Sequence, residues 1–240
     1  MSGKIPRWCF IRQRAMEEII VNRGYTLKTS GSGLQLGREF VAVLMLCGSV
    51  MAHATPVSPA AQRLVETVDA LDVEHHWPAG VHVNWQTGEP DGHEERTPGK
   101  HTHCSAFVAS AAKHLNIYIL RPPEHGQILL ANAQFEWLAN EGAAQGWRSV
   151  PGPVAAQAEA NEGRLVVATY RNHNDDKPGH IVIVRPTDKS DAAIRVEGPQ
   201  ITQAGGTNYR STSLKNGFSG HPAAWGGGEI RYYSHDVPAL

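Results

Sequence analysis

Cysteine, aromatic side chains and net charge are all scarce in this sequence of 240 residues. It contains 3 cysteines, 7% Phe, Trp and Tyr together, and a formal net charge of −1 at pH 7. A balance this close to neutral excludes the strong basic field that nucleic-acid binders and membrane-surface binders carry. With 19% charged and 41% hydrophobic residues, the chain is neither a coiled coil nor disordered throughout. We therefore expect a globular domain that binds no nucleic acid.

A membrane-spanning apolar run is also missing, because a helix needs about 20 such residues to cross a bilayer. The apolar run at residues 40–50 is shorter, follows Arg38 and precedes the sequence Met51-Ala52-His53-Ala54. A short apolar segment that ends in Ala-x-Ala is typical of a secretory signal peptide. We predict a signal peptide over about 38–54 and export of the protein, periplasmic or secreted, without stable membrane insertion. Residues 1–54 would then be a leader and signal peptide that are removed.

Removal of that leader changes which cysteines the protein retains. Cleavage after Ala54 would remove Cys9 and Cys47 and leave Cys104 as the remaining thiol. One cysteine cannot form an intramolecular disulfide, and a lone thiol outside the cytoplasm is liable to oxidation. Either Cys104 has a chemical role, or it is a buried apolar side chain, which is the common alternative.

Residues 55–240 have the pattern of a single α+β domain. Helices are predicted after the Ser58-Pro59 cap and over 104–115, 132–140 and 153–161. Strands separated by turn residues are predicted at 165–170, 180–186, 193–198, 199–205 and 229–235. Helices followed by a run of strands predict helices packed against an antiparallel sheet.

Cys104 opens the first predicted buried helix, after the sequence Gly99-Lys100-His101-Thr102-His103. At a helix N-terminus the unpaired N–H groups and the positive end of the dipole favour a thiolate. We therefore expect the pKa of Cys104 to lie below the usual value of about 8.5 and the sulfur to be nucleophilic. The same N–H groups could hold the oxyanion of a tetrahedral intermediate.

A nucleophilic thiol needs a base, and His180 stands at the first position of a predicted strand, after Pro178-Gly179. A third polar group would orient the imidazole, and Glu197, Gln200 and Gln203 follow along the chain. The start of one antiparallel strand lies opposite the end of the next, which favours Gln200 and Glu197. Spacing alone does not separate these two.

This order of elements resembles the papain-like cell-wall hydrolases, the CHAP amidase and NlpC-type group. The resemblance rests on a Cys that opens a helix (HTHCSAFVASAAKHL), a Gly-His that opens a strand (PGHIVIVRP) and a polar residue further on (AIRVEGPQITQAG), and it covers roughly residues 95–235. It implies a papain-like core with Cys104 as nucleophile and His180 as base. The third position varies in such enzymes among Glu, Asn, Gln and His. Gln200 is our first choice and Glu197 the second.

The resemblance further implies hydrolysis of an amide or peptide bond, with peptidoglycan stem peptides as substrate and without a metal or organic cofactor. An enzyme of this kind that serves as a weapon would also meet a protein inhibitor or immunity partner. Export into a wall-bearing compartment agrees with this substrate. The chain departs from the group because no Trp or Tyr stands beside Cys104.

Two other classes of function remain open from the sequence. Residues 75–125 are rich in histidine, and His101, His103 and Cys104 could bind zinc or copper, although their spacing does not match the usual zinc pairs. The other alternative is a catalytically inactive domain of the same fold that binds the cell wall or a partner protein.

Overall fold

A six-stranded antiparallel sheet forms the centre of the computed structural model, which describes residues 55–93 and 102–238. In spatial order the strands are β1 (Arg148–Val150), β6 (Arg231–His235), β2 (Leu165–Tyr170), β3 (His180–Val184), β4 (Gln200–Gln203) and β5 (Tyr209–Ser213). Every neighbouring pair is antiparallel. The predicted signal peptide, with Cys9 and Cys47, lies outside the described residues.

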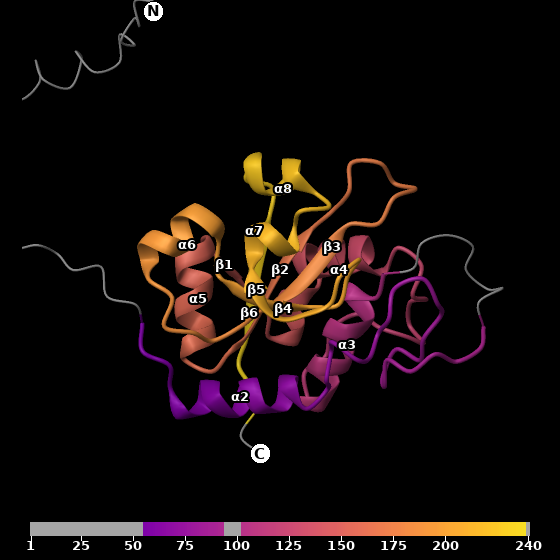
Figure 1. The fold of residues 1–240 in the computed structure, drawn as a ribbon, viewed down its shortest axis with the longest axis horizontal. Helices are drawn as coiled ribbons and strands as arrows, with labels where there is room; N and C mark the ends of the chain where they lie inside the picture. The colour runs from indigo at the N-terminus through magenta and orange to yellow at the C-terminus, as the bar shows by residue number, and fades with distance from the viewer. Residues whose placement is uncertain (1–54, 94–101, 239–240) are drawn as a thin grey trace, which may run out of the picture. The chain divides into compact units, whose positions relative to one another are not determined.

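The two central strands are buried along their whole length, because helices pack on both faces of the sheet (Figure 1). One face packs against α2 (Pro59–Asp69), α3 (Cys104–His114) and α4 (Leu130–Asn140), and α4 leads into the short 3-10 helix η3 (Gly142–Gln145). The other face packs against α5 (Pro153–Asn161), α7 (Leu214–Gly217) and α8 (Pro222–Gly226). These layers confirm the predicted α+β class with an antiparallel sheet.

Strand alternation assigns each side chain of β3 to one of these faces. Ile181 and Ile183 belong to the core beside α3, whereas Val182 and Val184 belong to the core on the opposite face. Since side chains alternate along a strand, the His180 ring lies on the face of Val182. Its contact with Phe218, which follows α7, agrees with this assignment.

Helix α3 is the most deeply buried of the described helices, since every residue from Cys104 to Ala112 is buried. Its side chains are mostly small, so the helix can approach the sheet closely. The residue before it, His103, makes no side-chain cap; its Nε2 instead lies 2.8 Å from the carbonyl oxygen of Val81. Cys104 is therefore the first helical residue, as the sequence predicts.

One predicted strand is wrong. Of residues 193–198, all but the last fall in the helix α6 (Asp191–Glu197). Ser190 caps this helix by accepting a hydrogen bond at Oγ from the N–H of Ala193, and Gly198 ends it. The strand β5, over Tyr209–Ser213, was not predicted and forms the sheet edge beside β4.

None of the helices in residues 55–93 and 102–238 has the length and apolar character that a membrane span requires.

Candidate functional site

The Cys104 thiol is buried at the start of α3, with 3% of the residue exposed. Burial raises the pKa of the thiol, and hydrogen bonds from the N–H groups of Ile181, Ser105 and Cys104 itself only partly offset this effect. The expected N–H groups at the helix start are present, but the expected low pKa is wrong because desolvation outweighs them. The resting sulfur is a neutral thiol near pH 7.

The N–H of Ile181 connects the thiol to the predicted base. Ile181 directly follows His180, so the sulfur lies at the first peptide unit of β3. The thiol belongs to the core beside α3, while the His180 ring lies on the opposite face of the sheet. Within the described residues no hydrogen bond links the Cys104 sulfur to the imidazole. The two groups reach the start of β3 from different sides.

His180 is buried, and its environment is mainly apolar. The ring Nε2 lies 3.0 Å from Gln203 Oε1, and the Phe218 ring meets the imidazole edge-on at 4.8 Å between centroids. Burial lowers the pKa of His180, and the hydrogen bond to Gln203 counteracts this only in part. The imidazole is therefore neutral at pH 7, which is the state a general base requires.

The Gln203 amide determines which nitrogen of His180 carries the proton. Gln203 Nε2 donates to the carbonyl oxygen of Thr207 at 3.0 Å, so the amide oxygen faces the imidazole. An amide oxygen can only accept a hydrogen bond, and His180 must therefore donate from Nε2. This tautomer leaves Nδ1 with its lone pair free to take a proton.

The structure brings neither Gln200 nor Glu197 to the imidazole. Gln200 Nε2 donates to Ser211 Oγ at 2.8 Å, and its backbone N–H donates to Gln157 Oε1 at 2.9 Å. Glu197 ends helix α6 and pairs with Lys189 at 2.7 Å. Because β3 and β4 are antiparallel, the start of β3 lies beside the end of β4, and Gln203 is the last residue of that strand.

A second imidazole, which sequence reasoning missed, lies against the first. The His221 ring stacks on His180 at 5.9 Å between centroids with 28° between the planes, and it lies 5.3 Å from the Tyr170 ring. Burial, and to a lesser extent the charge of His180, lower the pKa of His221. No sequence signal marks this residue, because it stands in the short connection between α7 and α8.

The loop that leads into His180 is held from α4. Asn132 donates from Nδ2 to the Lys177 carbonyl at 3.0 Å and accepts at Oδ1 from the Asn172 N–H at 3.2 Å. A Cβ at Gly179 would overlap the carbonyl oxygen of Tyr170 and come within 2.6 Å of Asn132 Oδ1. Only glycine fits this close approach, which explains the Gly-His pair at the start of β3.

The alternative metal site is not formed by the described residues. Within residues 55–93 and 102–238, no group of three His, Cys, Asp or Glu side chains is arranged to hold a metal ion. His103 contacts the Val81 carbonyl, and His101 lies outside the described residues.

No protein-family model matches this chain, and no curated protein matches it. Function must therefore be inferred from the side chains of the site.

Proposed function

We propose that this protein is a cysteine-dependent hydrolase of amide or peptide bonds, with a papain-like core, that acts on the stem peptides of bacterial peptidoglycan. The observation that carries the proposal is the Gln203–His180 hydrogen bond. This bond holds His180 in the tautomer whose Nδ1 carries a free lone pair. The Cys104 sulfur accepts a hydrogen bond from the N–H of Ile181, the residue that follows His180.

In the proposed reaction His180 Nδ1 takes the proton of Cys104 while the sulfur attacks the carbonyl carbon of the scissile bond. Backbone N–H groups at the start of α3 stabilise the oxyanion. The tetrahedral intermediate then collapses: the amine leaves with the proton from His180, and a thioester remains on Cys104. Water, deprotonated by His180, attacks the thioester and releases the acid and the free thiol.

The resting geometry requires an adjustment before this step, because no hydrogen bond joins the sulfur and the ring. Catalytic hydrogen bonds are often long before substrate binds and tighten in the complex. The neutral state of both groups is consistent with such a mechanism, since the proton moves only as the bond to carbon forms.

Two sequence features support peptidoglycan as the substrate. The sequence predicts export, and the order of elements resembles that of cell-wall hydrolases. Neither distinguishes the individual amide bonds of the stem peptide.

The test is digestion of purified peptidoglycan by the chain that begins at Thr55, followed by identification of the fragments by mass. Cys104→Ala and His180→Ala should abolish cleavage while circular dichroism shows that the domain is folded. His75→Ala is the matched control, because this histidine is exposed and pairs with exposed Asp72 at 2.8 Å. Full activity of Cys104→Ala would exclude the thiol mechanism. Cleavage of other peptides but not of peptidoglycan would keep the mechanism and exclude the substrate.

A further inference from the structure

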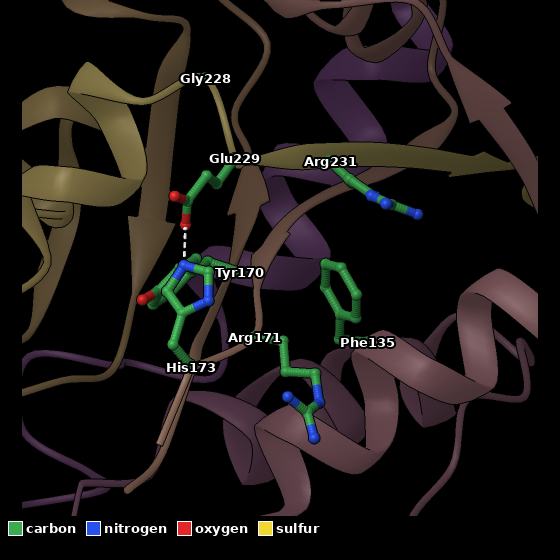
Figure 2. Close-up of a pocket in the computed structure, with 7 residues that line it drawn as sticks. All are labelled: Phe135, Tyr170, Arg171, His173, Gly228, Glu229 and Arg231. Atoms are coloured by element: carbon green, nitrogen blue, oxygen red, sulfur yellow. Dashed lines mark hydrogen bonds and ion pairs between the residues drawn. The ribbon is translucent and has the colours of Figure 1, made fainter. Parts of the chain in front are cut away.

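A pocket of about 390 Å³ opens at the end of β2, close to the proposed catalytic histidine. Figure 2 shows its lining, which comes from α4, from the end of β2 with the segment after it, and from the segment that leads into the first residue of β6. The lining residues are Phe135, Tyr170, Arg171, His173, Gly228, Glu229 and Arg231. This pocket has no role in the chemistry described above.

Tyr170 links the pocket to the candidate site. In the sheet Tyr170 pairs directly with His180, and its ring lies 5.3 Å from that of His221, which stacks on His180. The pocket therefore adjoins the rings that surround His180, and a peptide bound over the ends of β2 and β3 could place its next groups in the pocket.

Most of the charged groups in the pocket are already paired. Arg171 forms ion pairs with Glu136 at 2.8 Å and with Asp175 at 2.6 Å. His173 Nε2 lies 2.8 Å from Glu229 Oε2, the contact drawn as a dashed line in Figure 2. The carboxylates of Glu136, Asp175 and Glu229 are therefore each paired with a basic side chain.

Arg231 is different, because no carboxylate in the described part of the chain pairs with it. Its guanidinium carbon lies 5.1 Å from the centre of the Phe135 ring, so the aromatic face holds the cation at the edge of the cavity. An arginine in this setting keeps its planar fork of N–H donors available for a ligand.

We infer that this pocket binds a carboxylate of the peptide substrate through Arg231, with apolar parts of the peptide against Phe135 and Tyr170. The inference rests on the proposed function, since the bound group would belong to the peptide that Cys104 cleaves. A carboxylate matches the guanidinium fork with two parallel hydrogen bonds. A doubly charged phosphate fits less well, because the Glu229 carboxylate lines the same pocket, and Arg231 is the one cation of its described lining that has no carboxylate partner.

The test measures binding apart from hydrolysis. Calorimetry with the Cys104→Ala protein would compare a stem tetrapeptide that has free carboxylates with the same peptide in fully amidated form. We expect the free acid to bind about tenfold more tightly, as for loss of one charge-assisted hydrogen-bonded contact. Arg231→Gln should remove this preference, and Arg231→Lys should restore it in part because it keeps the charge without the fork.

Arg63→Gln is the matched control, since Arg63 is an exposed arginine of α2 and does not line the pocket. Equal binding of the acid and the amide, or a preference that survives Arg231→Gln, would overturn the inference. Inorganic phosphate that binds as tightly as the peptide acid, in an Arg231-dependent manner, would also overturn it.

These outcomes are separable from those of the proposed function. If wild-type protein cleaves peptidoglycan and Arg231→Gln leaves KM unchanged, the pocket assignment fails and the hydrolase proposal stands. If the acid preference depends on Arg231 but wild-type protein cleaves no peptide, the pocket assignment stands and the hydrolase proposal fails.

Discussion

Gly217 lies so close to Gln203 that a Cβ at position 217 would come within 2.6 Å of the Gln203 Oε1 atom. It would also come within 2.5 Å of the Ile201 side chain. The amide that orients His180 therefore occupies space that only a glycine at the end of α7 leaves open. The position of the Gln203 oxygen depends on this contact as well as on the hydrogen bond from Gln203 to Thr207.

Gly217→Ala should consequently lower activity by displacing the Gln203 amide. We expect kcat to fall about tenfold to a hundredfold, as for displacement of a catalytic group by about 1 Å. Overpacking should also lower the free energy of unfolding by about 1–3 kcal/mol. Peptidoglycan digestion and urea denaturation measure the two effects. In the NMR spectrum, the ¹⁵N shifts of His180 should move away from those of the Nε2–H tautomer.

Gly220→Ala is the control for this variant, because a Cβ at Gly220 meets no atom within 4 Å. Its activity and tautomer should match the wild type. If Gly217→Ala loses stability but keeps its turnover and the His180 tautomer, the amide does not control the imidazole.

Two glutamines of the same strand should differ sharply when replaced by alanine. Gln203→Ala removes the acceptor for His180 Nε2, so the ring can rotate and change tautomer, and kcat should fall by at least tenfold. Gln200→Ala loses a hydrogen bond to Ser211 at the other end of β4 and should leave kcat within about twofold. Steady-state kinetics on a soluble stem peptide would check both. Equal losses at the two positions would contradict the assignment of Gln203.

The sequence was sufficient to place Cys104 at a helix start and His180 at a strand start, but not to identify the residue that hydrogen-bonds the imidazole. Cys104 opens a helix and His180 opens a strand as predicted, because caps, turns and apolar periodicity are local signals. The identity of the third residue depends on where the next strand ends and on which way its side chains face. Reading residues 193–198 as a strand placed Gln200 and Glu197 too close to His180.

The misread segment shows why local patterns failed there. AIRVEG alternates apolar and polar residues, as a strand does, but Ser190 and Gly198 bound it as a helix cap and a helix end. His221 is brought to His180 by packing of the α7–α8 connection over the sheet. Such a contact depends on the tertiary fold, and no single-sequence pattern encodes it.

Asp69 should make a measurable contribution to stability by linking α2 to the sheet. Its carboxylate accepts hydrogen bonds from Arg185 at 2.8 Å and Arg210 at 2.7 Å, and 14% of the side chain is exposed. We expect Asp69→Ala to lower the free energy of unfolding by about 2 kcal/mol, because two guanidinium groups lose their partner. Urea denaturation measures the change. Glu66→Ala, at an exposed carboxylate of α2, should change it by less than about 0.5 kcal/mol.

The two ion pairs of Asp69 should make the stability of the fold depend on pH. Burial acts to raise the pKa of Asp69, but hydrogen bonds and the charges of Arg185 and Arg210 outweigh it, and the net pKa lies below its usual value. The stabilisation is therefore present above about pH 3.9 and lost as the pH falls through the folded-state pKa. If Asp69→Ala loses as much stability as the wild type when the pH is lowered, the Asp69 ion pairs are not the source of the pH dependence.

Cys104 should be alkylated slowly in the folded protein at neutral pH. Because burial raises the pKa of its thiol, the midpoint of the iodoacetamide reaction should lie above the free-thiol value of about 8.5. Trapping rates across pH 6–10, with mass spectrometry of the labelled peptide, would measure it. A midpoint well below 8.5 would mean that the resting site holds a thiolate–imidazolium pair.

The proposed hydrolase activity should fall at acid pH with a midpoint below the usual histidine value. Burial lowers the pKa of His180 below about 6.5, so the imidazole stays neutral in the ligand-free protein as the pH drops. The acid limb of kcat/KM should therefore lie below pH 6.5. Gln203→Ala should shift it further down, because the hydrogen bond to Gln203 raises the pKa of His180. His221, stacked on His180, titrates in the same direction, so His221→Phe is the control that separates the two rings. If His221→Phe removes the acid limb of kcat/KM and Gln203→Ala leaves its midpoint unchanged, the base has been assigned to the wrong imidazole.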